Sequence, residues 1–234
     1  MMVIGSVLYI VATPIGNLED ITHRALRVLG EVDVLACEDT RRTRILLEKY
    51  GVRKPGKVIS YREQNEADAV PGIIKLLEEG KRVAVTSDAG YPGISDAGYR
   101  LISEALDKGI RVEVIPGAGA VEPALLSSGL PTDSFTFLGF LPKKQGPRKR
   151  ILEAEMDRNH TLVIFESPLR LGKILEEACE VLGNRKAAIC IELTKMFEEV
   201  HRGYLSDLLE RFRDRRIKGE VTIVIAGNNP KFLK

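Results

Sequence analysis

The chain has 234 residues, 44% of them hydrophobic, and a formal net charge of +2 at pH 7. A chain of this length and hydrophobicity can bury one large core or two smaller ones, which excludes an intrinsically disordered protein. Because acids and bases nearly balance, a nucleic-acid function would have to rest on local clusters of charge.

The first apolar run, VLYIVA at residues 7–12, is far shorter than the roughly 20 residues that a membrane span needs. No basic region precedes it as in a signal peptide, so we expect a soluble, cytoplasmic protein with no membrane attachment. The cysteines, Cys37, Cys179 and Cys190, lie in apolar stretches without the close pairing of a zinc site. They predict buried free thiols and no metal site.

In the first half of the chain, short β-branched runs alternate with helical patterns. The expected strands are SVLYIVA (6–12), VDVLACE (32–38), KVISY (57–61), RVAVTS (82–87) and RVEVIP (111–116). The expected helices lie within 21–30, 40–51, 65–80 and 96–109, and the first should have Asp20 as its N-cap and Gly30 as its C-terminal stop. Strands that are apolar on both faces indicate a parallel sheet covered by helices.

The alternation of strand and helix patterns changes after the loop PGAGAVEP at 116–123. There, FTFLGFLP leads into the basic segment KKQGPRKR (143–150) rather than a regular crossover helix. We therefore expect an α/β fold with an N-terminal α/β domain at 1–116 and a C-terminal α/β domain at 117–234. The second should contain strands at 161–166, 187–193 and 220–227 and helices at 168–183 and near 205–216, with Ser167 and Pro168 starting the longer helix.

Five loops that follow expected strands are rich in glycine and polar residues. They are ATPIGNLED (12–20), CEDTRR (37–42), SYREQNE (60–66), TSDAGYPGISDAG (86–98) and PGAGA (116–120). Ligands of parallel α/β sheets bind beyond the carboxyl ends of strands, and glycine lets the backbone approach them. The loops lack the dinucleotide and P-loop signatures, and GISDAG lacks the spacing of a hydrolase elbow. They predict a nucleotide-like ligand, although tight turns alone explain any single loop.

Eight segments together resemble a known bacterial family. They are LYIVATPIGNLEDIT, ACEDTRRTRILL, SYREQNE, SDAGYPGISDAG, GFLP, FESPLR, ELTKMFE and VTIVIAG, which span nearly the whole chain in order. The chain resembles the 16S rRNA cytidine 2′-O-methyltransferases, a branch of the tetrapyrrole methylase superfamily. The resemblance implies two α/β domains, S-adenosyl-L-methionine bound in the cleft between them, 16S rRNA of the small ribosomal subunit as substrate, and a homodimer.

The resemblance also implies which residues hold the cofactor. The cofactor residues are Pro14, Ile15 and Gly16 in the first loop, Asp88, Gly90, Tyr91 and Ile94 in the fourth, and Gly117, Gly119 and Ala120 in the fifth. Asp96 is expected to cap the following helix instead. Positive charge at a helix start and in the segment 143–150 favours an anionic partner, so RNA phosphate is assigned to Arg41, Arg42, Lys143, Lys144 and Arg170.

Six residues depart from the family's usual pattern: Arg62, Gln64, Tyr91, Ala97, Gly119 and Leu169. Arg62 and Gln64 stand where the third loop commonly carries two histidines, and Gly119 replaces a common serine. A proton-transfer role for the third loop is therefore in doubt, and one hydroxyl contact to the cofactor is lost.

Methyl transfer to a ribose hydroxyl depends mainly on positioning, helped by a group that accepts or polarises the leaving proton. The candidates are Lys195 first, Glu166 second, then Glu192 and Asp39, each of which would otherwise serve as a cap or an ion pair. Two rival functions remain: carbon methylation of a corrin or porphyrin precursor, and cofactor-sensing RNA binding without catalysis.

Overall fold

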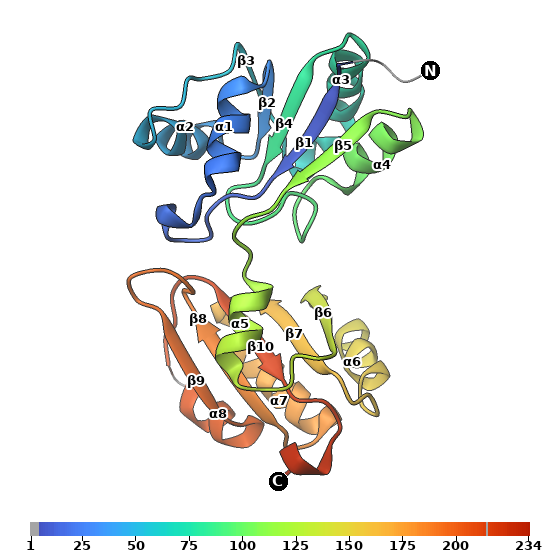
Figure 1. The fold of residues 1–234 in the computed structure, drawn as a ribbon. Helices are drawn as coiled ribbons and strands as arrows, with labels where there is room; N and C mark the ends of the chain where they lie inside the picture. The colour runs from blue at the N-terminus through green and yellow to red at the C-terminus, as the bar shows by residue number, and fades with distance from the viewer. Residues whose placement is uncertain (1–4, 214) are drawn as a thin grey trace. The chain divides into compact units, whose positions relative to one another are not determined.

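The computed structural model describes residues 5–213 and 215–234. The chain forms two compact units, one ending at Gly119 and the other beginning at Ala120. Each contains a five-stranded sheet with helices packed against it (Figure 1). The boundary between the two units lies close to the loop at 116–123, where the sequence pattern changes.

The sheet of the first unit is parallel throughout, as expected, in the order β3-β2-β4-β1-β5. Its strands are β1 (Val7–Val11), β2 (Val34–Cys37), β3 (Lys57–Ser60), β4 (Arg82–Thr86) and β5 (Arg111–Ile115). All carboxyl ends of a parallel sheet lie at one edge, so the loops after β1 to β5 gather there.

Helices cover both faces of this sheet. They are α1 (His23–Glu31), α2 (Thr40–Lys49), α3 (Glu66–Glu78) and α4 (Tyr99–Asp107). In β2, Val34 and Ala36 pack into the core shared with α3 and α4, whereas Leu35 and Cys37 pack into the core shared with α1 and α2. This alternation is the ordinary consequence of the strand's twofold side-chain period.

Three expected helix boundaries in this unit were wrong. Thr22, not Asp20, caps α1, because its hydroxyl accepts a 3.1 Å hydrogen bond from the Ala25 amide. The helix α1 runs through Gly30, and α4 begins after Gly98 rather than at Asp96. Gly98 has φ +150°, and a Cβ there would lie 2.6 Å from the Gly93 amide nitrogen, so the close loop contact requires glycine.

The second unit contains a mixed sheet in the order β6-β7-β10-β8-β9. Its strands are β6 (Phe135–Phe140), β7 (Thr161–Glu166), β8 (Lys186–Ile191), β9 (Glu199–Tyr204) and β10 (Val221–Ile225). Only β6 and β7 pair in parallel, and the other neighbours are antiparallel. The helices α6 (Gln145–Ala154), α7 (Leu171–Leu182) and α8 (Leu205–Phe212) share one core, and α5 (Val121–Ser128) packs on strands of the same sheet.

Two features of this unit differ from expectation. The basic segment 143–150 enters a regular crossover helix, α6, and β9 is a strand that the sequence pattern did not predict. In α6, Arg148 is only 1% exposed and binds Glu177 with Nη2–Oε1 of 2.6 Å. Part of the basic segment therefore belongs to the core.

Smaller expectations were met in part. Ser167 caps a short 3-10 turn, Pro168–Arg170, from which α7 continues. The helix expected near 205–216 ends at Phe212, and residue 214 lies outside the described residues. Cys37 and Cys190 are buried free thiols, whereas Cys179 is half-buried. No helix in 5–213 or 215–234 has the length and apolar character of a membrane span.

Candidate functional site

The first and fourth strand-end loops are joined by backbone hydrogen bonds. The Thr13 amide donates to the Gly90 carbonyl at 2.9 Å, and the Gly90 amide donates to the Thr13 carbonyl at 3.0 Å. The Thr13 hydroxyl also donates to the Ser87 carbonyl at 3.1 Å. Gly90 has φ +80°, and a Cβ there would meet Ile15 Cγ2 at 3.6 Å. Glycine thus allows the two loops to meet in this conformation.

Tyr91 fastens the fourth loop to the fifth. Its hydroxyl oxygen accepts from the Gly117 amide at 3.0 Å and lies 3.3 Å from the Gly117 carbonyl, to which it can donate. A Cβ on Gly117 would lie 3.1 Å from the Ala12 Cβ, so the fifth loop also lies close against the end of β1. The three loops expected to hold the cofactor therefore lie together within the first unit.

The remaining expected cofactor residues have simpler positions. Pro14 and Ile15 are buried at the end of β1, Gly16 is exposed, and Ile94 is half exposed in the fourth loop. Gly119 ends the first unit and Ala120, which begins the second, is the N-cap residue of α5.

Asp88 connects the fourth loop to the second. Its Oδ1 accepts from the Asp39 amide at 3.0 Å, and its own amide donates to Glu38 Oε2 at 3.1 Å. Its Oδ2 also lies 3.4 Å from a guanidinium nitrogen of Arg42. The carboxylate that the sequence assigns to the cofactor is thus occupied in holding the neighbouring loop and its arginine.

Asp39 caps α2 and pairs with Arg41. Its Oδ1 accepts from the Arg41 amide at 2.8 Å, and its Oδ2 lies 2.8 Å from Arg41 Nη2. The guanidinium hydrogen bonds, with the amide bond beside them, hold the pKa of Asp39 well below its usual range. A carboxylate with a lowered pKa is a weak proton acceptor near neutral pH, so these contacts favour a structural role.

Lys195, in the second unit, pairs with two carboxylates. Its Nζ lies 2.7 Å from Glu192 Oε1 and 3.2 Å from Glu220 Oε2. Partial burial opposes the charge, but hydrogen bonds to the two carboxylates outweigh it and raise the pKa of Lys195 above its ordinary value. Lys195 therefore remains a cation at neutral pH, able to polarise an oxygen but not to take its proton.

The loop that carries Lys195 has unusual backbone geometry. Glu192 has φ +52° and Thr194 has φ +66°, both in a region that side chains other than glycine rarely adopt. Contacts hold it there: the Thr194 amide donates to Glu198 Oε2 at 2.6 Å, and Glu192 Oε1 accepts from the Glu220 amide at 2.9 Å. Strained backbone held by such contacts is frequent at functional sites.

Glu166 and Arg170 form a partly buried pair. The Glu166 side chain has no exposed surface, and its Oε1 accepts from Arg170 Nε at 2.7 Å and from the Ser167 amide at 2.6 Å. Its Oε2 is buried with no hydrogen-bond partner among the described residues. Arg170 also donates to the Leu141 carbonyl at 3.1 Å, so it is bound within the second unit rather than free for phosphate.

The other expected RNA contacts lie on the surface. Arg41 and Arg42 have side chains 83% and 69% exposed, although each faces a carboxylate. Lys143 and Lys144 are exposed just before α6. Arg148 holds the loop before α6 from inside, since its Nη1 donates to the Pro142 and Lys143 carbonyls at 2.9 Å each.

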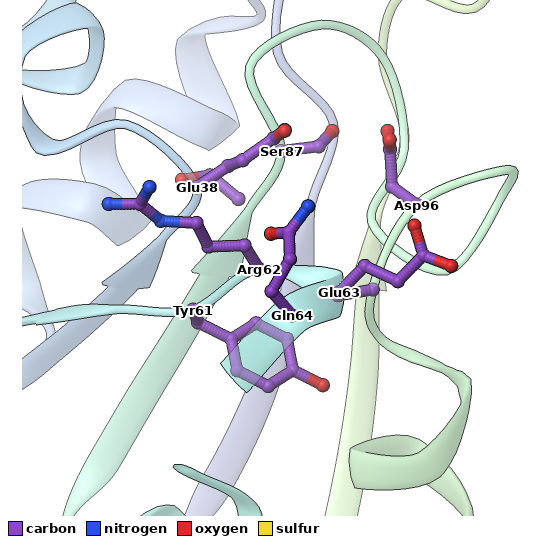
Figure 2. Close-up of a pocket in the computed structure, with 9 residues that line it drawn as sticks. Glu38, Tyr61, Arg62, Glu63, Gln64, Ser87 and Asp96 are labelled. Atoms are coloured by element: carbon purple, nitrogen blue, oxygen red, sulfur yellow. The ribbon is translucent and has the colours of Figure 1, made fainter. Parts of the chain in front are cut away.

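A small pocket of about 70 Å³ opens at the carboxyl edge of β2, β3 and β4 (Figure 2). It is lined by Glu38, Tyr61, Arg62, Glu63, Gln64, Thr86, Ser87, Asp96 and Ala97. Sequence reasoning named none of these as ligand-binding. Their only signal was that they belong to the second, third and fourth of the strand-end loops expected to face a ligand.

Comparison with known proteins places the chain in a family. The profile of the Tetrapyrrole (Corrin/Porphyrin) Methylases matches residues 7–209. The chain is 47% identical to "Ribosomal RNA small subunit methyltransferase I" of Halalkalibacterium halodurans, over 96% of this chain and 77% of that protein. It is 46% identical to the protein of the same name from Thermotoga maritima, over 94% of this chain and 98% of that protein.

A solved structure supports the same fold. The uroporphyrin-III-C-methyltransferase of Thermus thermophilus superposes with a TM-score of 0.67 at 23% identity, covering 95% of this chain and 94% of that one. At this identity the likeness concerns the fold alone, and it confirms the expected class of two α/β domains. The chain belongs to the tetrapyrrole (corrin/porphyrin) methylase family, in the branch of the proteins named ribosomal RNA small subunit methyltransferase I.

Proposed function

We propose that this chain methylates small-subunit ribosomal RNA, and that its target is the 2′-hydroxyl of a cytidine ribose in 16S rRNA. The observation that carries the proposal is the joining of the first, fourth and fifth loops through Thr13, Gly90, Tyr91 and Gly117. The names of the relatives support RNA as substrate, and the cytidine and its 2′-hydroxyl come from the sequence resemblance.

We assign S-adenosyl-L-methionine as the methyl donor. The joined loops fit a ligand that is held mainly by main-chain groups. Gly90 and Gly117 have no side chains, so no Cβ covers the main chain at these two positions of the strand-end loops. The residues that would hold it are those expected from the resemblance: Pro14, Ile15, Gly16, Asp88, Gly90, Tyr91, Ile94, Gly117, Gly119 and Ala120. When bound, the cofactor supplies a methyl group activated by its sulfonium.

The task left to the protein is to orient the ribose hydroxyl and to stabilise its oxygen as the proton leaves. Lys195 suits the second task, because its pairs with Glu192 and Glu220 keep it positively charged. Glu166 is the second candidate for the group that assists the leaving proton. Its hydrogen bond with Arg170 favours a role in positioning that arginine. Arg41, Arg42, Lys143 and Lys144 would contact phosphate and supply affinity rather than sequence choice.

The test is to incubate the protein with isotopically labelled S-adenosyl-L-methionine and small ribosomal subunits that lack the modification. Digestion to nucleosides and mass spectrometry should find the label in 2′-O-methylcytidine. Label on a base would contradict the ribose assignment. In a parallel incubation with a tetrapyrrole precursor, label in the tetrapyrrole but none in RNA would identify the enzyme as a corrin or porphyrin methyltransferase. Cofactor binding with no transfer to either would identify a binding module.

The resemblance also leads us to propose a homodimer that acts in the cytoplasm. Sedimentation velocity should give about twice the mass of the chain, and a single monomeric boundary at micromolar concentration would contradict the dimer.

A further inference from the structure

The pocket of Figure 2 shares the fourth loop with the loops assigned to the cofactor, because Thr86, Ser87, Asp96 and Ala97 belong to its lining. The rest of the lining comes from the ends of β2 and β3, whereas the other joined loops follow β1 and β5. None of its lining residues is among those assigned to the cofactor or to phosphate. A ligand in this pocket would therefore contact residues that neither the cofactor nor the RNA phosphates are assigned to.

The third loop, which forms one wall, is held firmly in place. The Tyr61 hydroxyl donates to Glu66 Oε1 at 2.6 Å, and the same oxygen accepts from the Gly98 amide at 2.9 Å. Glu66 thus ties the third loop to the fourth. Within the third loop, Arg62 Nε donates to the Ser60 hydroxyl at 3.0 Å and the Arg62 amide donates to Asn65 Oδ1 at 2.8 Å. A wall fixed in this way is preorganised for a ligand.

Three polar side chains of the lining, those of Thr86, Glu63 and Gln64, make no hydrogen bond to another described residue. Thr86 is 2% exposed, and its Oγ1 makes no hydrogen bond to any described residue. The Glu63 carboxylate and the Gln64 amide are exposed and also make none with residues of 5–213 or 215–234, so they are free to meet a ligand. In Figure 2 the Gln64 amide points away from the Tyr61 ring and toward Ser87. Buried polar groups are nearly always satisfied, so an unpaired hydroxyl in a pocket wall indicates a polar ligand.

The chemistry of the lining selects the ligand. Glu38, Glu63 and Asp96 outweigh the single cation Arg62, which excludes phosphate and favours hydrogen-bond donors. The Gln64 amide and the Arg62 guanidinium can donate to an acceptor beside such a donor. A pocket of about 70 Å³ holds roughly five waters at the space each needs, which suits one small ring better than two fused ones.

We propose that this pocket receives the base of the target nucleotide and recognises cytosine, so that this inference rests on the proposed function. Cytosine presents an exocyclic amine next to ring acceptors, and carboxylates are the side chains that accept from that amine. Uracil presents a carbonyl oxygen at the same position, which the carboxylates repel. Enzymes that modify nucleotides in RNA commonly take the base out of its stack into such a pocket.

The first test uses cytidine and uridine as separate probes at millimolar concentration, with binding followed by ¹H–¹⁵N NMR shifts of the protein. Cytidine should shift the amides of Gln64, Thr86 and Ser87 and bind about tenfold more tightly than uridine, the discrimination expected of one good base contact. Equal affinity for the two nucleosides, or shifts confined to other loops, would overturn the assignment of the pocket.

The second test separates a ligand role from a structural one. Thr86→Val removes an unpaired hydroxyl at similar volume, so the thermal midpoint should stay or rise while cytidine affinity falls about tenfold. Glu63→Gln should reduce the preference for cytidine over uridine, and the exposed control Glu79→Gln should change neither. Unchanged cytidine affinity in both Thr86→Val and Glu63→Gln would overturn the proposal.

Activity on ribosomal subunits keeps the two proposals apart. If wild type methylates RNA but Thr86→Val and Glu63→Gln retain its kcat/KM and its discrimination against a uridine at the target position, the pocket assignment fails and the methyltransferase proposal stands. If wild type methylates no RNA yet discriminates the nucleosides through Gln64 and Thr86, the proposed reaction fails and the base pocket stands.

Discussion

Asp88 acts on the protein's own loops at the residue scale. Because its carboxylate holds the Asp39 amide and faces Arg42, Asp88→Ala should release the second loop and weaken cofactor binding roughly tenfold, the value of one hydrogen bond to a charged group. Asp88→Asn keeps an acceptor and should lose less. Calorimetric titration measures both, with the exposed Asp133→Ala as control, and an unchanged affinity in Asp88→Ala would show that the loop does not depend on this contact.

Tyr91 offers a sharper test, since one atom joins two loops. Tyr91→Phe removes the acceptor of the Gly117 amide and should lower the free energy of unfolding by about 1 kcal/mol. Cofactor affinity should fall with it, because the fifth loop is no longer fastened. The exposed Tyr99→Phe is the matched control in denaturant melts and titrations; equal behaviour of the two variants would refute the role of the Tyr91 hydroxyl.

Lys195 is predicted to act as a cation. Lys195→Ala should leave cofactor affinity unchanged and reduce kcat by about 10² to 10³, as loss of one electrostatic stabiliser does, while Lys195→Arg should recover part of the rate. Because its pKa is raised above 10.5, the charge persists through neutral and mildly alkaline pH. Its deprotonation should therefore lower the rate only above about pH 10. A rate that rises with deprotonation between pH 7 and 9, absent in Lys195→Ala, would identify it as a base instead.

At the scale of elements, α6 is fixed to α7 by the buried pair Arg148 and Glu177. Glu177→Gln should lower the free energy of unfolding by about 3–5 kcal/mol, because it leaves Arg148 buried without its counter-charge. The Arg148 hydrogen bonds outweigh burial and lower the pKa of Glu177 below 4.5. This stabilisation is present above pH 4.5 and is lost as pH falls through the lowered pKa. Urea melts between pH 3 and 7 should show a flatter acid dependence in Glu177→Gln than in the exposed control Glu176→Gln.

The elements also show where sequence patterns succeed. The central strands β1, β2 and β4 of the first unit are mostly apolar on both faces, so their positions and parallel pairing followed from the sequence pattern. In contrast, β9 reads Glu-Val-His-Arg-Gly-Tyr and is an edge strand paired only with β8, which leaves no apolar alternation to detect. The helix α6 was hidden because Gly146 and Pro147 suggest a loop and because Arg148 is buried by a partner distant in sequence.

The same limit applies to the candidate site. Glycine-rich loops at strand ends pointed to the edge of the sheet at which the joined loops and the pocket lie, but the partner of each side chain did not follow from local pattern. Asp96 resembled a helix cap, whereas Gly98 is the residue before α4, and the backbone there passes Gly93 too closely for any side chain. The pocket with Thr86 in its wall depends on three strands whose neighbours are fixed only by the fold.

For the whole molecule, a net charge of +2 gives little general attraction to RNA, so affinity should depend on a few local cations. The double variant Lys143→Ala, Lys144→Ala should reduce the slope of log affinity against log salt by about 1 to 2, since each phosphate contact contributes somewhat under one. Cofactor affinity should not change. The exposed pair Arg53→Ala, Lys54→Ala serves as the control, and an equal slope in the two double variants would remove residues 143–144 from the RNA surface.

The backbone bridge between Thr13 and Gly90 has an evolutionary consequence. A joint made by amides and carbonyls survives almost any exchange of side chains, provided that the glycine stays. The loops it fixes can therefore vary in sequence without losing their contact at the ends of β1 and β4.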